Sequence, residues 1–191
     1  MSEAVYLPLD CESGGIGKDI SLLTAHFAVC DKDFNVIDEL DIALKPSEVD
    51  QTGSTIYKVT ASALAINNVN LIEHDKVAIT KAFAGQKVRE FIWKYKPVGG
   101  YLIPVGKNVG GDVEWVNQHI LGAAEWRRSV SYRLYDITSL VIYLKNVGKL
   151  APDAPDSLSK LAEYLDIHAE WHTARGDNMA GIAVVKKLQS L

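Results

Sequence analysis

The sequence has little of what marks disulfide-stabilised, zinc-stabilised or membrane-spanning proteins. Among 191 residues, only Cys11 and Cys30 are cysteines, too few for a disulfide framework or for a four-ligand zinc spacing. No run approaches the roughly 18 apolar residues of a membrane span. Residues 1–9 lack the basic region and apolar run of a secretory signal. We therefore expect a cytoplasmic protein with reduced thiols, and no membrane partner.

The chain also has no excess of positive charge. Lys and Arg number 20 against 24 Asp and Glu, which gives a net charge of −4. A protein that coats duplex nucleic acid is usually basic, so the composition disfavours that class, although a small local site for nucleic acid stays open. Apolar residues at 48% and charged residues at 23% are ordinary for a globular protein. We expect one domain over residues 1–191.

The hydrophobic pattern predicts an antiparallel meander followed by alternating strands and helices. Apolar runs bounded by turn signals predict five strands, at 4–10, 22–30, 34–44, 101–105 and 130–135. Helical spacing predicts helices at 75–95, 112–121, from 136 onward, 157–165 and 178–189. This order favours an α/β fold, a five-stranded mixed sheet flanked by helices, and it is the pattern of a ribonuclease H-like core.

Two carboxylates stand at the end of the first predicted strand. Asp10 and Glu12 are two residues apart, so both side chains point to one face of a strand. Two carboxylates on one face repel each other unless a cation lies between them, and Mg²⁺ prefers such oxygen ligands. Alone, the pair is equally typical of a solvated strand end.

Three further polar residues lie at or before the start of a predicted helix, and each has a structural alternative. Asp112 follows two glycines after the fourth strand, and Asp177 precedes the last helix. Either could be only a helix N-cap. His172 lies five residues before Asp177 and could be a surface histidine. His168 could pair with it around zinc, but no third ligand stands at a suitable spacing.

The order of these residues along the chain resembles the DEDDh family of 3′–5′ exonucleases, which includes proofreading exonucleases, ribonuclease T and oligoribonuclease. Residues 7–13 (LPLDCES), 105–112 (VGKNVGGD) and 172–177 (HTARGD) resemble its three motifs. The likeness extends from the first strand to the final helix. It departs at Lys107 and Gly111, where family members often have His and an aromatic residue.

The resemblance implies a role for each motif residue. The metal ligands would be four carboxylates, Asp10, Glu12, Asp112 and Asp177, holding two divalent ions, Mg²⁺ or Mn²⁺. His172 would be the general base, and the substrate contacts would come from Ser13, Gly14 and Asn108. The reaction would be hydrolysis of phosphodiester bonds at single-stranded 3′ ends of DNA or RNA, releasing nucleoside monophosphates.

Other functions remain open at this point. One is a catalytically silent ribonuclease H-like module that binds a partner protein. Another is a phosphodiesterase that uses the same site without acting as an exonuclease. The sequence does not choose DNA over RNA, and residues 45–74 are its least readable part, a candidate for substrate contacts.

Overall fold

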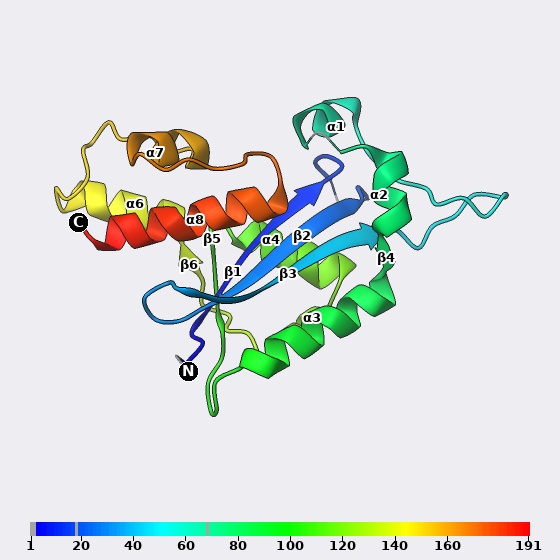
Figure 1. Cartoon of the computed structure of the whole chain (residues 1–191), viewed down its shortest axis with the longest axis horizontal. Helices are drawn as coiled ribbons and strands as arrows, with labels where there is room; N and C mark the ends of the chain where they lie inside the picture. Colours follow the sequence, from blue (N-terminus) through cyan, green and yellow to red (C-terminus); the bar gives the residue numbers. More distant parts are fainter. Residues whose placement is uncertain (1–2, 18, 68) are drawn as a thin grey trace.

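The computed structural model describes residues 3–17, 19–67 and 69–191 and shows one mixed sheet between two layers of helices (Figure 1). The strand order is β4-β3-β2-β1-β5-β6. The strands are β1 (Tyr6–Ser13), β2 (Leu22–Cys30), β3 (Val36–Lys45), β4 (Ile79–Thr80), β5 (Ile103–Gly106) and β6 (Tyr135–Asp136). β1, β2 and β3 pair antiparallel, whereas β5 pairs parallel with both β1 and β6. The predicted α/β class and the meander followed by parallel strands are confirmed.

Helices cover both faces of this sheet. They are α1 (Ala61–Asn67), α2 (Leu71–Val77), α3 (Lys81–Tyr95), α4 (Gly110–His119), α5 (Ala123–Trp126), α6 (Ile137–Asn146), α7 (Leu158–Tyr164) and α8 (Ala174–Gln189). α8 crosses one face against β1 and β2, with α6 and α7 beside it, while α3 and α4 lie on the other (Figure 1). No helix in the described ranges is long and apolar enough to cross a membrane.

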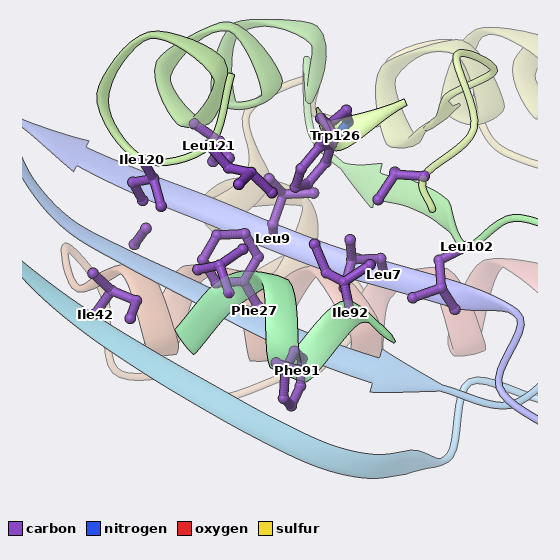
Figure 2. Packing of buried hydrophobic residues seen from close by; sticks show 14 of the residues in the cluster. Leu7, Leu9, Phe27, Ile42, Phe91, Ile92, Leu102, Ile120, Leu121 and Trp126 are labelled. Carbon is purple, nitrogen blue, oxygen red and sulfur yellow. The ribbon is translucent and has the colours of Figure 1, made fainter. Parts of the chain in front are cut away.

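The alternation along the central strands divides the core between these faces. Leu9 of β1 and Phe27 of β2 are register partners on the α3 and α4 side, where they pack with Ile120 and Leu121 (Figure 2). On the other face, a second cluster joins β2 to α6, α7 and α8. The face that carries α8 is also the face toward which Asp10 and Glu12 point.

The prediction of five strands is wrong, because β4 was not anticipated. Ile79 and Thr80 pair with Leu44 and Lys45 at the end of β3. A two-residue strand is too short to show a period of two. The predicted strand 130–135 is also largely wrong, since only an isolated bridge and the short β6 form there.

The predicted helix 75–95 begins later than expected. Asp75 lies inside α2, where it accepts a hydrogen bond from the Tyr57 hydroxyl (2.8 Å) and pairs with Lys45 (3.1 Å). α3 begins at Lys81, and the side chain of Thr80 accepts from the backbone N–H of Phe83 (3.4 Å) as its N-cap. Asp and Thr are both suitable N-cap residues, so the sequence allowed a helix start at Asp75 as well as the observed one after Thr80.

Candidate active site

The site forms where β1 continues past the end of β5. The β1–β5 ladder covers only Tyr6 to Pro8, so the rest of β1 runs beside the turn that leads from β5 into α4. The ends of parallel strands, where the chain departs into helices, are the usual place for sites in α/β folds. Asp10 and Glu12 lie on this free part of β1.

Three carboxylates converge there from opposite ends of the sequence. One oxygen from each of Asp10, Glu12 and Asp177 lies within 4.8 Å of the other two. Asp177 occupies the first turn of α8, which begins after the N-cap Thr173, whose hydroxyl accepts from the N–H of Gly176 (3.0 Å). Asp177 Oδ1 is buried without a hydrogen-bond partner in the described chain, so it is available to a cation.

The carboxylates of this cluster resist ionisation when no cation is present. Burial, followed by the charges of Asp112, Asp177 and Glu12, raises the pKa of Asp10 well above its ordinary value. Burial and then Asp177 raise the pKa of Glu12 to about 7. The pKa of Asp177 is also raised by burial, against an opposing effect of His172. The fold thus concentrates negative charge that a divalent cation would neutralise.

Asp112 stands beside this group and is held differently. Its Oδ1 accepts a hydrogen bond from the backbone N–H of Cys11 (3.1 Å), on the edge of β1 that β5 has left. Burial raises the pKa of Asp112 to about 7, although this hydrogen bond opposes the shift. Asp112 is close enough to raise the pKa of Asp10, so the structure brings all four predicted carboxylates to one place.

The Cys11 thiol is not a further ligand of this cluster. It faces the α4 side, packs against the core there and lies 3.9 Å from the Asp112 carbonyl oxygen. Burial raises the pKa of the thiol well above its ordinary value, so it stays protonated. A protonated thiol is a poor ligand for a hard cation.

His172 lies at the entrance to α8, immediately before its N-cap. The residue is exposed, and its φ of 65° is in the left-handed region that histidine adopts only uncommonly. No hydrogen bond to its imidazole occurs among the residues that the structure describes. The ring is thus free to turn, and its assignment as general base stays a prediction.

The last residue of β1 and the first residue of the loop after it are two of the predicted substrate contacts. The Ser13 hydroxyl donates to the carbonyl of Gly15 (2.7 Å). Gly14 already donates its N–H to Ser21 (2.8 Å), and a Cβ there would lie 2.6 Å from a methyl of Val59. Close packing therefore requires glycine at position 14, and its N–H is engaged within the protein. Contact of Ser13 and Gly14 with substrate stays a prediction.

Asn108, the third predicted contact, lies in the turn between β5 and α4. It is exposed with a φ of 54°, and its Oδ1 accepts from the hydroxyl of Thr138 (2.9 Å). The first turns of α4, which follow it, face the loop after β1 across a groove of about 380 Å³, and Asn108 itself does not line this groove. The groove is lined by Ser13, Gly15, Ile16, Gly17, Gly111, Glu114, Trp115 and Gln118.

A buried polar network beneath α8 was not identified from the sequence. Asn178 Nδ2 donates to His26 Nδ1 (2.9 Å) and to the carbonyl of Pro8 (3.1 Å). The other ring nitrogen of His26 lies 3.2 Å from Glu39 Oε2, which also accepts from Arg175 (3.0 Å). Since Nδ1 accepts from the amide, Nε2 carries the proton that bonds Glu39. A histidine inside an otherwise apolar strand was the available signal.

This network ties the first turn of α8 to three strands. Pro8 belongs to β1, His26 to β2 and Glu39 to β3, while Arg175 and Asn178 flank Asp177 in α8. Asp10 and His26 are also register partners. Hydrogen bonds thus connect the start of α8, which carries Asp177, to β1, β2 and β3.

Solved structures of exonuclease I share this fold. Its product-bound structure aligns with a TM-score of 0.73 at 17% identity, over 100% of this chain and 44% of that chain. Escherichia coli exonuclease I in complex with a dT13 oligonucleotide aligns with a TM-score of 0.71 at 17% identity, over 99% and 41%. The chain spans less than half the length of these proteins. No protein-family model and no curated protein matches the sequence.

Proposed function

We propose that this chain is a metal-dependent 3′–5′ exonuclease of the DEDDh type, which hydrolyses single-stranded nucleic acid from its 3′ end and releases nucleoside monophosphates. The observation that carries the proposal is the convergence of Asp10, Glu12 and Asp177 within 4.8 Å, with Asp112 adjoining. The fold shared with exonuclease I, one structure of which holds a dT13 oligonucleotide, supports the same reading.

The residues present fit two divalent ions, Mg²⁺ or Mn²⁺. The donor set consists of carboxylate oxygens, which hard cations prefer, and Asp177 Oδ1 has no protein partner in the described chain. Asp10, Glu12 and Asp177 would hold one ion together, and Asp112 would contribute its second oxygen to the other. Bound ions supply activation of water and stabilisation of the leaving oxygen.

Proton transfer and the positioning of the substrate would depend on residues other than the carboxylates. We assign His172 as the general base, because its imidazole is exposed, free of hydrogen bonds to the described residues and beside Asp177. A neutral imidazole can accept the proton of an attacking water. The groove between the loop after β1 and α4, which Ser13 lines, would receive the terminal nucleotide, and we assign Gly14 and Asn108 as further substrate contacts.

The proposal extends to the chain as a whole. We assign residues 1–191 to one exonuclease domain, and we assign the protein to the cytoplasm, consistent with two cysteines that are both unpaired. Either DNA or RNA could be the substrate of this reaction, because the carboxylates would act at the phosphodiester and not at the sugar.

A labelled oligonucleotide tests the activity. A single strand labelled at its 5′ end should shorten stepwise from the 3′ end in Mn²⁺, and EDTA should abolish the reaction. Asp10→Ala should remove activity while the melting temperature without metal stays unchanged or rises, since the substitution relieves repulsion. A strand left intact in Mn²⁺ would favour the silent module, and internal fragments would favour a phosphodiesterase of another kind.

A further inference from the structure

A cluster of positive charge lies away from the carboxylates, in a chain whose net charge is −4. Three of the five arginines, Arg127, Arg128 and Arg133, fall within seven residues between α5 and β6. Two of them line a pocket of about 210 Å³, which we call the Tyr101–Tyr132 pocket. Its lining consists of Tyr101, Arg127, Val130, Ser131, Tyr132 and Arg133.

The cations of this pocket are not neutralised by the protein. The two arginines outside the segment each pair with a glutamate, whereas no carboxylate in the described parts of the chain pairs with Arg127 or Arg133. Arg133 instead lies over the ring of Tyr132 (5.1 Å), and Lys96 lies over the ring of Tyr101 (5.6 Å). Both rings are exposed, Tyr132 by 75% and Tyr101 by 54%. The surface therefore offers unpaired cations beside accessible aromatic rings.

The pocket is connected to the candidate active site by an exposed segment. Val130 bridges to Leu102 just before β5, and β6 pairs with the end of β5, so residues 130–136 run alongside this strand. Residues 132–134 are exposed along this path. At its far end, the side chain of Leu134 lies 3.6 Å from where a Cβ on Gly110 would stand, at the start of α4. A ligand lying along this segment would reach the helix that carries Asp112.

We propose that the Tyr101–Tyr132 pocket is a second contact site for single-stranded nucleic acid, which holds the strand away from its 3′ end. Guanidinium groups bind phosphates through paired hydrogen bonds, and tyrosine rings stack on unpaired bases. A single strand supplies both groups, whereas an acidic peptide supplies anions but few planar partners for the two rings. The identity of the ligand as nucleic acid rests on the proposed function. The pocket, its positive charge and the exposed segment that connects it to α4 are independent of that function.

Binding in EDTA tests the pocket independently of hydrolysis. A labelled single strand of about 16 nucleotides, the upper end of common site sizes, is titrated with the protein at several salt concentrations. Removing two phosphate contacts with Arg127→Gln and Arg133→Gln together should reduce the slope of log affinity against log salt by about 1.4. Tyr132→Ala should weaken binding roughly 5- to 150-fold, the value of one stacked base.

Matched variants and a short substrate separate the possible outcomes. Lys149→Gln with Lys187→Gln removes two exposed cations elsewhere, and Tyr164→Ala removes an exposed ring on α7; both should leave binding unchanged. In Mn²⁺, the arginine variant should raise KM for the long strand but not for one of about 4 nucleotides. Unchanged affinity and salt slope would overturn the proposal, as would an acidic peptide that binds the pocket when the oligonucleotide does not. Absence of hydrolysis with intact binding would instead count against the exonuclease.

Discussion

Two helices each bring an aspartate to the end of β1, but they hold it by different means. The start of α8 is anchored to the sheet, since Asn178 bonds buried partners on β1 and β2, and Arg175 bonds the half-buried Glu39 of β3. α4 follows Val109 with no capping side chain, and its first turn is linked to β1 through Cys11, whose N–H donates to the Asp112 carboxylate and whose thiol lies near the Asp112 carbonyl. The position of Asp177 is thus imposed by the fold, whereas that of Asp112 depends on its own carboxylate.

Because of this difference, the carboxylates of Asp177 and Asp112 are available to a cation to different extents. Asp177 keeps a buried oxygen without a partner, whereas Asp112 uses one oxygen as a structural acceptor. Asp112 also lies outside the set of three carboxylates whose oxygens are within 4.8 Å of one another. We therefore expect substitutions at the two positions to affect cation binding unequally.

The largest effect should come from Asp177→Asn. It removes a charge from the group of three, so Mn²⁺ affinity measured by calorimetry and turnover should both fall by more than about 100-fold, the upper end for losing an outer-shell partner. Asp112→Asn retains an acceptor for the Cys11 N–H, so it should lose turnover while weakening Mn²⁺ binding less. Asp153→Asn is the matched control, because Asp153 is an exposed carboxylate in the turn between α6 and α7. Equal loss of Mn²⁺ binding in the two site variants would contradict the distinction.

His172→Ala tests the loop that enters α8. Turnover should fall roughly 10²–10⁴-fold, the usual scale for one acid–base group, while Mn²⁺ affinity is retained because the carboxylates remain. His168→Ala removes an almost fully exposed histidine of the same loop and should keep wild-type kinetics. A His172→Ala enzyme with wild-type kcat across the pH range would assign water activation to the metal alone.

Asn178→Ala tests the anchoring of α8. It leaves His26 Nδ1 and the Pro8 carbonyl without their donor, so the free energy of unfolding should fall by about 1–3 kcal/mol. If the network positions Asp177, kcat should also fall roughly 10- to 100-fold with little change in KM. Asn146→Ala, at the exposed end of α6, is the control. A loss of stability with unchanged kcat would show that the network only supports the fold.

Much of the fold and of the carboxylate site could be predicted from local sequence patterns. The features that could not be predicted are those that leave no local pattern in the sequence. The i, i+2 spacing of Asp10 and Glu12 on a strand was enough to place both on one face. The network under α8 joins Arg175 to Glu39 and Asn178 to His26 across 136 and 152 positions, and no local pattern links such partners. The strand β4 was missed because two residues are too few to show a period of two. Its residues lie directly before α3 and pair with the end of β3.

The pH dependence of stability without metal tests the carboxylates of the site when no cation is bound. Glu12 and Asp112 have folded pKa values raised from 4.5 and 3.8 to about 7, chiefly by burial. For a carboxyl raised in this way, the folded protein binds more protons than the unfolded chain between the two pKa values. Their contribution is therefore fully present below the unfolded pKa and is lost as pH rises through about 7.

Melting in EDTA should show this as a falling stability between pH 5 and 7, on the scale set by those shifts. His26 acts in the opposite direction, because burial lowers its pKa and the unfolded chain takes up its proton first. The difference between wild type and Asp112→Asn cancels His26 and isolates the carboxyl. Wild type should lose stability relative to this variant as pH rises, and Mn²⁺ should restore more of it at pH 7 than at pH 5. If the difference in stability between wild type and Asp112→Asn stays constant from pH 5 to 7, the pKa of Asp112 is not raised by folding. The carboxylate cluster would then not be destabilised by repulsion that a cation could relieve.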